Sequence, residues 1–308
     1  MRSLVAMDTI QIEVTNACIN ECSNCTRFCG HREPYFMREE TFKYAVDSME
    51  GFPQMIGIMG GEPLLHPQFE ALCEYMLSKF PKEQLGLWTC LPKRYEKYRD
   101  VICKTFGNIF INDHSRLDIL HAPILVSAKS VQLDPADMWI NINECWLQRS
   151  WSASINPKGA FFCEIAAAMS LLFSGNSGWP IEKFWWKRTP KNFVDQMEEY
   201  CPKCGCAFPL KRRSSLDIVD DISEDNLELL KGKSKKIKAG RYVLSDRKCF
   251  REPGEMAAYK DQAYRDRIAA EYGIFLIANE KGFLSPYLLT SPRSSKTLME
   301  QFKEEHGE

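Results

Sequence analysis

Four cysteines crowd one short stretch, NACINECSNCTRFCG at residues 16 to 30, and this stretch constrains the chain more than any other. Cys18, Cys22, Cys25 and Cys29 lie there without an apolar run that could bury them. The chain has 13 cysteines in 308 residues, and a chain of this size buries enough core to need no crosslinks. In a reducing cytosol such a surplus indicates metal ligands or catalysis before disulfides.

The charge balance argues against a polyanionic partner. The 40 basic and 41 acidic residues leave a formal charge of −1, so no global field would recruit nucleic acid or an acidic membrane. No stretch approaches the roughly 18 apolar residues that span a bilayer, and the start lacks a signal-peptide pattern. We therefore expect a cytoplasmic protein whose specificity lies in one local site for a small-molecule substrate.

Strand and helix patterns alternate along the first part of the chain. Residues 8 to 15 predict a strand and residues 38 to 50 a helix, with the cysteine stretch as the loop between them. The alternation then continues through QMIGIMGGEP, a helix at 67 to 80, QLGLWTC, a helix at 93 to 107, NIFIND and APILVSA. This predicts an α/β fold with a parallel sheet, open or curled into part of a barrel. Because active sites lie at the carboxyl ends of such strands, the cysteine loop and the GGEP turn should share one edge.

The composition of the sequence changes at residue 139, which indicates further structural units. We expect a barrel unit at 1–138, a smaller cysteine-rich unit at 139–210 and a C-terminal α+β extension at 211–308. The second unit contains INPKGAFFC, which predicts a hairpin, and ends with YCPKCGCAF. In the extension we interpret KGKSKKIKAGR as a solvated linker, and we expect a charged helix near 255 to 272 and a strand at GIFLIA.

Cys18, Cys22 and Cys25 form a C-x3-C-x2-C pattern in the first loop. A 4Fe-4S cluster normally takes four cysteines, so three leave one iron with an open position, and an open position favours chemistry. The alternative is a zinc site that takes Cys29 or His31 as its fourth ligand. Outside that alternative we expect both of these residues to have a structural role near the cluster.

These motifs resemble the radical S-adenosylmethionine superfamily: C-x3-C-x2-C follows the first strand, and Gly60-Gly61-Glu62-Pro63 follows the second. The resemblance implies a partial (β/α)6 TIM-like barrel. It also implies that Cys18, Cys22 and Cys25 hold a 4Fe-4S cluster whose free iron is chelated by S-adenosylmethionine. Gly60, Gly61 and Glu62 would contact the methionyl amine of that cofactor, and a flavodoxin- or ferredoxin-type protein would donate the electron.

One position departs from the family's pattern. The residue before the third cysteine is usually aromatic and reaches toward the adenine, whereas this chain has Asn24. Three further residues are candidate cofactor contacts only because they lie at or just after predicted strand ends: Thr89, Asn112 and Ser115.

A second set of cysteines offers four thiolates. Cys145 and Cys163 flank the predicted hairpin, and Cys201 and Cys204 form a C-x2-C. Four sulfurs can hold zinc or a 4Fe-4S cluster, and spacing alone leaves both open. The arrangement is similar to the twitch subdomain, a shortened SPASM domain, found in radical S-adenosylmethionine enzymes of the aminocyclitol dehydrogenase type, which implies an auxiliary 4Fe-4S cluster.

Five cysteines remain outside both ligand sets and the first loop. Cys206 and Cys249 are unassigned. Cys73, Cys90 and Cys103 stand alone in apolar or helical segments, where we interpret them as small buried hydrophobic residues.

The resemblance implies cleavage of S-adenosylmethionine and hydrogen abstraction from a carbon of the substrate. An auxiliary cluster could accept the substrate's electron, giving oxidation, whereas a thiol such as Cys206, Cys249 or Cys29 could return hydrogen, giving epimerisation. His114 and His121 are candidate bases, and Arg116 is a candidate anion clamp. The favoured substrate is a small sugar-like metabolite; the alternative is a maturase of ribosomally made peptides.

Overall fold

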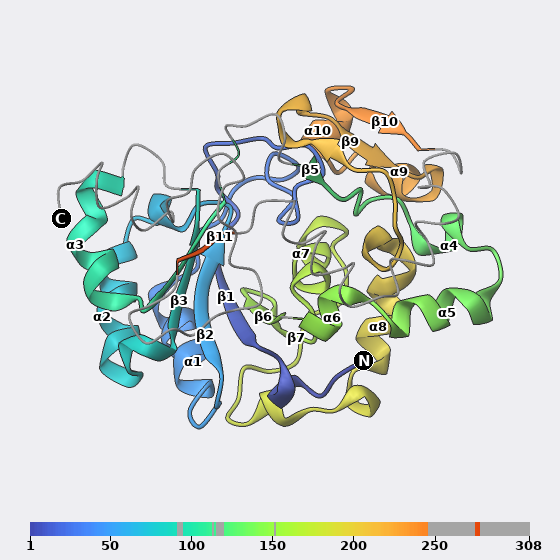
Figure 1. Ribbon diagram of the computed structural model, residues 1–308. Helices are drawn as coiled ribbons and strands as arrows, with labels where there is room; N and C mark the ends of the chain where they lie inside the picture. Colours follow the sequence, from blue (N-terminus) through green and yellow to red (C-terminus); the bar gives the residue numbers. More distant parts are fainter. Residues whose placement is uncertain (91–94, 113, 115–119, 151, 246–274, 278–308) are drawn as a thin grey trace, which may run out of the picture.

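A central β-sheet organises the computed structural model, which describes residues 1–90, 95–112, 114, 120–150, 152–245 and 275–277 (Figure 1). In this described part, seven strands lie in the order β11-β4-β3-β2-β1-β6-β7. Neighbours from β4 to β6 run parallel, and the outer β7 and β11 pair antiparallel. The strands are β1 Thr9–Thr15, β2 Met55–Gly60, β3 Leu85–Thr89, β4 Asn108–Ile111, β6 Ser152–Asn156, β7 Gly159–Phe161 and β11 Phe275–Ile277.

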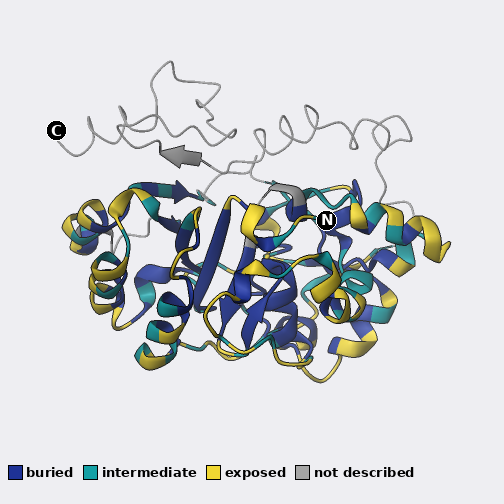
Figure 2. Ribbon diagram, turned by 90° about the horizontal axis from the view of Figure 1, so that it is seen from below, coloured by how far each residue is buried: buried dark blue, intermediate teal, exposed yellow. Residues whose placement is uncertain are grey.

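One face of the sheet is apolar and packs on helices. In β1, Ile10, Ile12 and Val14 alternate toward this face and are fully buried, as the two-residue period of a strand requires. Their core cluster includes Phe42 and Leu72 from the helices that follow β1 and β2. Figure 2 shows the strands buried at the centre, surrounded by helices whose outer surfaces are exposed. The helices after β1, β2 and β3 are α1 Glu39–Ser48, α2 Phe69–Lys79 and α3 Tyr95–Thr105.

The opposite face of β1 and β6 is polar although it is buried. We call it the polar face, and it consists of Thr9, Gln11 and Glu13 on β1 and Ser154 and Asn156 on β6, each at most 1% exposed. Buried parallel strands are normally apolar on both sides, so this row of polar side chains is unusual for a core.

Aromatic residues cover the same face farther along the sheet. The rings of Trp88 and Phe110 stack with centroids 4.1 Å apart, and Met59 completes their cluster. Gly57 makes this packing possible, because a Cβ there would lie 2.0 Å from the Trp88 ring. The sheet thus presents a polar half and an aromatic half on one face.

The second half of the chain extends the same sheet. The β6–β7 hairpin joins β1 through parallel pairing of Gln11 with Ser154, and one core cluster runs from Leu4 to Ile237. Helix α7 contacts β6 and β7. The remaining helices are α4 Ala128–Val131, α5 Pro135–Asn143, α6 Trp146–Ser150, α7 Glu164–Leu172, α8 Val194–Tyr200, α9 Glu224–Leu230 and α10 Lys235–Lys238.

Two small two-stranded sheets lie outside the central sheet. They pair β9 with β10 and β5 with β8. Figure 1 shows β9, β10 and α10 beside the loop that follows β1. Their bounds are β5 Leu120–His121, β8 Arg213–Ser214, β9 Asp220–Ile222 and β10 Tyr242–Leu244.

The mixed α/β fold with a parallel central sheet, consistent with a partial TIM-like barrel, is confirmed. The strands predicted at 8 to 15, in QMIGIMGGEP, QLGLWTC, NIFIND and GIFLIA, and the hairpin in INPKGAFFC, are all present. The strand predicted at APILVSA is wrong: Pro123, which cannot donate to a ladder, begins a turn in which Val126 N–H donates to its carbonyl. The boundaries 1–138, 139–210 and 211–308 stay predictions, and the helix expected near 255 to 272 falls outside the described residues.

No described helix has the length and apolar character that crossing a membrane requires.

Candidate functional site: two groups of cysteines

The glycine turn after β2 packs directly on the start of the cysteine loop after β1. Gly61 N–H donates to the Thr15 carbonyl at 2.8 Å, and Glu62 N–H donates to the Ala17 carbonyl at 2.7 Å. A Cβ on Gly60 would lie 2.4 Å from the Thr15 oxygen, and one on Gly61 would lie 2.3 Å from the Ala17 oxygen. Only glycine fits at both positions, so the two motifs meet at the edge of the sheet where they were expected.

The thiols of the cysteine loop lie close enough to affect one another's ionisation. Hydrogen bonds from the Cys29 and Cys90 thiols lower the pKa of Cys18 to about 3. A hydrogen bond from Cys29 also lowers the pKa of Cys25. Burial, followed by the charges of Cys25 and Cys18, raises the pKa of Cys22 to about 12. The three expected ligands therefore gather in one place, with Cys29 and Cys90 against them.

Cys90 was interpreted as an isolated buried residue, and that interpretation is wrong. Its thiol lies 2.9 Å from Glu62 Oε2 and contacts the Cys18 sulfur, because β3 ends beside β2. Cys103 is exposed, which also contradicts its interpretation as a buried residue, whereas Cys73 is fully buried as expected.

Glu62 links the ends of β2 and β3 through its carboxylate. Its Oε1 accepts from Leu64 N–H at 3.0 Å and from the Thr89 hydroxyl at 2.8 Å. Its Oε2 accepts from Cys90 N–H at 2.8 Å and lies 2.9 Å from the Cys90 sulfur. The side chain is fully buried, and this burial raises its pKa. The expected contact of Glu62 with a methionyl amine stays a prediction, and the described contacts give it a role in positioning the turn.

The other expected cofactor contacts have internal partners as well. The Asn24 amide nitrogen donates to Asp221 Oδ2 at 2.8 Å, and its amide oxygen accepts from Asp221 N–H at 2.9 Å. Asn24 is thus held by β9. Asn112 N–H donates to the Thr89 carbonyl at 2.9 Å, which keeps both residues at the strand ends. Ser115 and Arg116 lie outside the described residues.

A buried charge network ties the cysteine loop to β9 and α10. Lys236 Nζ donates to the Cys22 carbonyl at 2.9 Å and lies 2.9 Å from Asp220 Oδ2. The second partner of Asp220 is His31, whose Nε2 lies 2.8 Å from Oδ2 and whose Nδ1 lies 2.9 Å from Ser234 Oγ. Burial tends to raise the pKa of Asp220, but His31 and Lys236 outweigh it and hold that pKa below its usual value.

This network corrects the interpretation of KGKSKKIKAGR as a solvated linker. Lys236 is only 2% exposed, and Ser234 begins α10 by accepting from Ile237 N–H. A composition of Lys, Gly and Ser is common in exposed loops. The sequence of this segment does not indicate which of its lysines is buried in an ion pair with a distant aspartate.

The two candidate bases lie beside the cysteine loop. The rings of His114 and His121 meet edge to face with centroids 4.9 Å apart, and His121 Nδ1 lies 2.7 Å from the Ser23 carbonyl. Because that carbonyl can only accept, His121 Nδ1 carries the proton. Burial, followed by the charge of His114, lowers the pKa of His121 to about 4. His121 is therefore neutral near pH 7.

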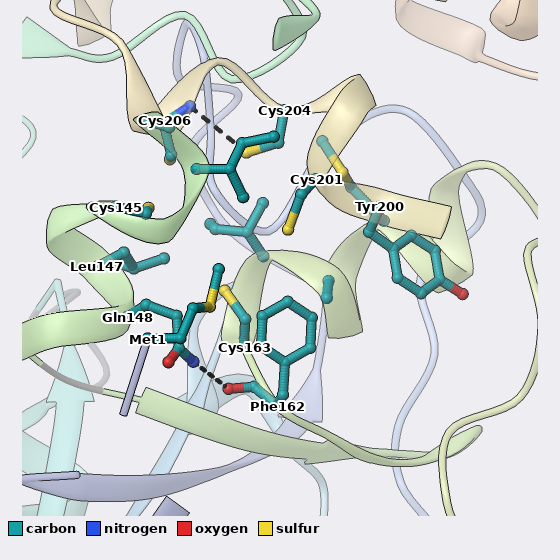
Figure 3. A pocket seen from close by; sticks show the side chains of 15 residues that line it. Met1, Cys145, Leu147, Gln148, Phe162, Cys163, Tyr200, Cys201, Cys204 and Cys206 are labelled. Carbon is teal, nitrogen blue, oxygen red and sulfur yellow. Dashed lines mark hydrogen bonds between the residues drawn. The ribbon is translucent and has the colours of Figure 1, made fainter. Parts of the chain in front are cut away.

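The second group of cysteines lines one pocket (Figure 3). Cys145, Cys163, Cys201 and Cys204 all contribute, as expected, together with Cys206. Burial raises the pKa of Cys145 to about 11 and raises that of Cys163 and Cys201 as well. The other lining residues are mostly apolar side chains of α6, α7 and α8.

Cys206 was unassigned from the sequence, and it lies against Cys204. Its backbone N–H donates to Cys204 Sγ at 3.4 Å. Its thiol donates to the same sulfur, which lowers the pKa of Cys204 and raises that of Cys206.

The donor chemistry of both groups suits iron or zinc, since both bind thiolates. Within the described residues, however, no three Cys, His, Asp or Glu side chains already stand around a common metal position. The sulfurs are thus gathered but would still have to turn toward a bound group.

Comparisons with known proteins give a likeness of fold. No family model and no curated protein matches the sequence. Among solved structures, BtrN in complex with AdoMet and 2-DOIA is 15% identical, with a TM-score of 0.44 over 64% of this chain and 88% of that chain. Selenomethionine BtrN in an open conformation is 15% identical, with a TM-score of 0.43 over 64% and 86%. These values describe a likeness in part of the fold, and neither a family nor an activity follows from them.

Lys236→Met tests the buried network. The substitution leaves Asp220 buried with one partner fewer, and losing one member of a buried ion pair costs about 3 kcal/mol. We expect the free energy of unfolding, measured by urea titration with tryptophan fluorescence, to fall by about that amount. The control is Lys235→Met on the same helix, because Lys235 is 56% exposed at its side chain and should cost under about 1 kcal/mol. Equal losses in both variants would contradict the network.

Proposed function

We propose that this chain is a radical S-adenosylmethionine enzyme that takes hydrogen from a carbon of a small, sugar-like metabolite, giving oxidation or epimerisation. The observation that carries the proposal is the packing of the Gly60–Gly61 turn on the loop that holds Cys18, Cys22 and Cys25. Three thiolates leave one iron of a cluster without a protein ligand, and a glycine turn beside them lets an amino-acid-like cofactor approach the backbone. Together these features suit the binding of a cluster and such a cofactor.

In this proposal Cys18, Cys22 and Cys25 hold a 4Fe-4S cluster. When bound, that group supplies the electron that cleaves S-adenosylmethionine to methionine and a 5′-deoxyadenosyl radical. Because the turn consists of glycines, its backbone can approach the cofactor closely. Glu62 holds the turn against β3 through hydrogen bonds with Thr89 and Cys90. The network of Asp220 and Lys236 fixes the loop backbone at Cys22. A flavodoxin- or ferredoxin-type protein is the proposed electron donor.

The second group would hold an auxiliary 4Fe-4S cluster through Cys145, Cys163, Cys201 and Cys204. Support comes from their convergence on one apolar pocket, where every thiolate would be screened from water and available to a soft metal. Such a group could accept an electron from the substrate, which favours oxidation as the outcome.

The polar face supports a substrate rich in hydroxyl groups. In the described part of the chain, Thr9 Oγ1, Gln11 Oε1 and Ser154 Oγ are buried without a hydrogen-bond partner. Buried polar atoms are normally paired, because leaving one unpaired costs about 1–3 kcal/mol. Gln11 and Ser154 are register partners on neighbouring strands. Three neighbouring unpaired oxygens are suited to hydrogen bonds from a polyol.

The charges beside this face disfavour a phosphorylated substrate. Arg27 Nη1 lies 3.0 Å from Glu13 Oε2, and Arg27 Nη2 lies 3.8 Å from Glu164 Oε1. The Tyr35 hydroxyl donates to Glu13 Oε1 at 2.7 Å. The described charges are thus one cation and two carboxyl groups. Arg27 Nη2 has no hydrogen-bond partner, but two carboxyl groups already face the Arg27 charge, so an added anion would have to compete with both of them. A neutral or cationic metabolite fits better.

Cys22→Ala tests the first site. We expect the variant to form no 5′-deoxyadenosine from S-adenosylmethionine and dithionite, because two thiolates cannot retain the cluster. Cys103→Ala on the exposed surface of α3 is the control and should keep the wild-type rate. Undiminished 5′-deoxyadenosine in Cys22→Ala would refute the proposal.

Gln11→Leu tests the substrate class. We expect binding of an unphosphorylated polyol or aminopolyol from a calorimetric panel to weaken about tenfold, the equivalent of one hydrogen bond of about 1.4 kcal/mol. The control Ile12→Leu, on the apolar face of the same strand, should bind as the wild type does. Tighter binding of sugar phosphates than of their parent sugars, or equal binding by Gln11→Leu, would contradict the assignment.

A further inference from the structure

We propose that Cys206 is a positioning residue whose thiol hydrogen-bonds to the sulfur of Cys204 and thereby raises the reduction potential of the iron–sulfur group at the second site. This inference rests on the proposed function, because it takes Cys145, Cys163, Cys201 and Cys204 as the ligands of that group.

Five cysteines share a pocket that needs four. Cys145, Cys163, Cys201, Cys204 and Cys206 all line it, and a 4Fe-4S cluster has four iron corners for protein sulfur. One thiol is therefore in excess. Figure 3 shows the five sulfurs arranged around the cavity and the bond from the Cys206 backbone to Cys204.

The local backbone identifies Cys206 as the excess thiol. Gly205, Cys206 and Ala207 form a 3-10 turn capped by the Cys204 sulfur, which accepts from Cys206 N–H. The first site has the same backbone bond, but the donor residue there is not a cysteine: Asn20 N–H donates to Cys18 Sγ at 3.4 Å. In both loops, the sulfur of a proposed ligand cysteine accepts a hydrogen bond from the backbone N–H of the residue two positions later.

The contacts of Gly205 restrict the backbone of this turn and so fix the direction of the Cys206 side chain. Gly205 N–H donates to the Ile124 carbonyl at 3.0 Å, and a Cβ on Gly205 would lie 2.5 Å from the Pro123 oxygen and 2.7 Å from the Val126 oxygen. Cys206 itself is only 5% exposed. The turn is therefore clamped against residues 123–126, and the Cys206 thiol stays beside the Cys204 sulfur.

The direction of the effect follows from charge. Reduction adds an electron to a thiolate-bound cluster, so a donor on a ligand sulfur stabilises the reduced form more than the oxidised form and raises the potential. The surroundings are mostly apolar, and a low dielectric strengthens such a bond. Cys206 would make the second site a better electron acceptor, as oxidation of a substrate requires.

The experiment uses the full chain with Cys18, Cys22 and Cys25 all replaced by Ala, so that iron binds only at the second site. Cys206→Ala and Cys206→Ser are added to this background, with Cys73→Ala, a buried thiol in α2, as the control. After anaerobic reconstitution with iron and sulfide, iron per chain and the midpoint potential by electron paramagnetic resonance are measured.

We expect about four irons per chain in every variant. Cys206→Ala should shift the one-electron equilibrium about tenfold toward the oxidised form, which is about 59 mV more negative. Cys206→Ser should recover most of the shift because its hydroxyl also donates, and Cys73→Ala should not change the potential.

Three results would overturn the inference, and they are distinguishable. Four irons with an unchanged potential in Cys206→Ala would reject the hydrogen bond and leave the proposed function intact. Loss of iron from Cys206→Ala, with iron retained by Cys204→Ala, would make Cys206 a ligand. Zinc alone, or no iron, in the background variant would reject the auxiliary cluster and the role of Cys206 with it.

Discussion

The close approach of two backbone segments, the Gly60–Gly61 turn and the start of the cysteine loop, is the constraint on which the site depends. Two hydrogen bonds from the turn satisfy the carbonyls of Thr15 and Ala17, and any Cβ at either glycine would enter those oxygens. Parallel pairing of β1 with β2 brings the two loops to the same edge. Within the loop, hydrogen bonds between the thiols and burial shift the pKa values of Cys18, Cys22 and Cys25.

Residues about 200 positions later complete the cysteine loop. Asp220 and Asp221 of β9 bind His31 and Asn24, and Lys236 of α10 reaches the Cys22 carbonyl. Burying these charges costs free energy that their pairing only partly offsets. What the network contributes is a defined position for a loop that has no regular secondary structure. It also accounts for the orientation of Asn24, whose side-chain amide is bonded to Asp221 of β9.

Much of the sheet could be predicted, because alternating apolar residues report a strand wherever packing agrees with pattern. Strands β1 to β4 and the β6–β7 hairpin follow that rule, and helices α1 to α3 follow the helical period of 3.6 residues. APILVSA has the same composition but contains Pro123, and contacts with the turn at Gly205 outweigh its strand propensity. The position of β6 beside β1 could not be read from the sequence, because pairing over about 140 residues leaves no local signal.

The spacing of the cysteines also predicted which of them lie together, but it could not predict which other residues contact them. C-x3-C-x2-C and C-x2-C are local patterns, whereas Cys90 reaches Cys18 only because β3 lies next to β2. Lys236 is one of several lysines in a basic run, and the burial that distinguishes it arises from the fold alone. Cys206 was visible as an extra thiol, yet its contact with Cys204 depends on a turn held by distant carbonyls.

The central claim is that three thiolates leave one iron corner free for a cofactor. Electron paramagnetic resonance of the dithionite-reduced, reconstituted protein, recorded with and without S-adenosylmethionine, tests it most directly. The account predicts that the cofactor changes the signal of one cluster, because a new ligand binds its free iron. Identical spectra with and without the cofactor, in protein shown to contain the cluster, would contradict it.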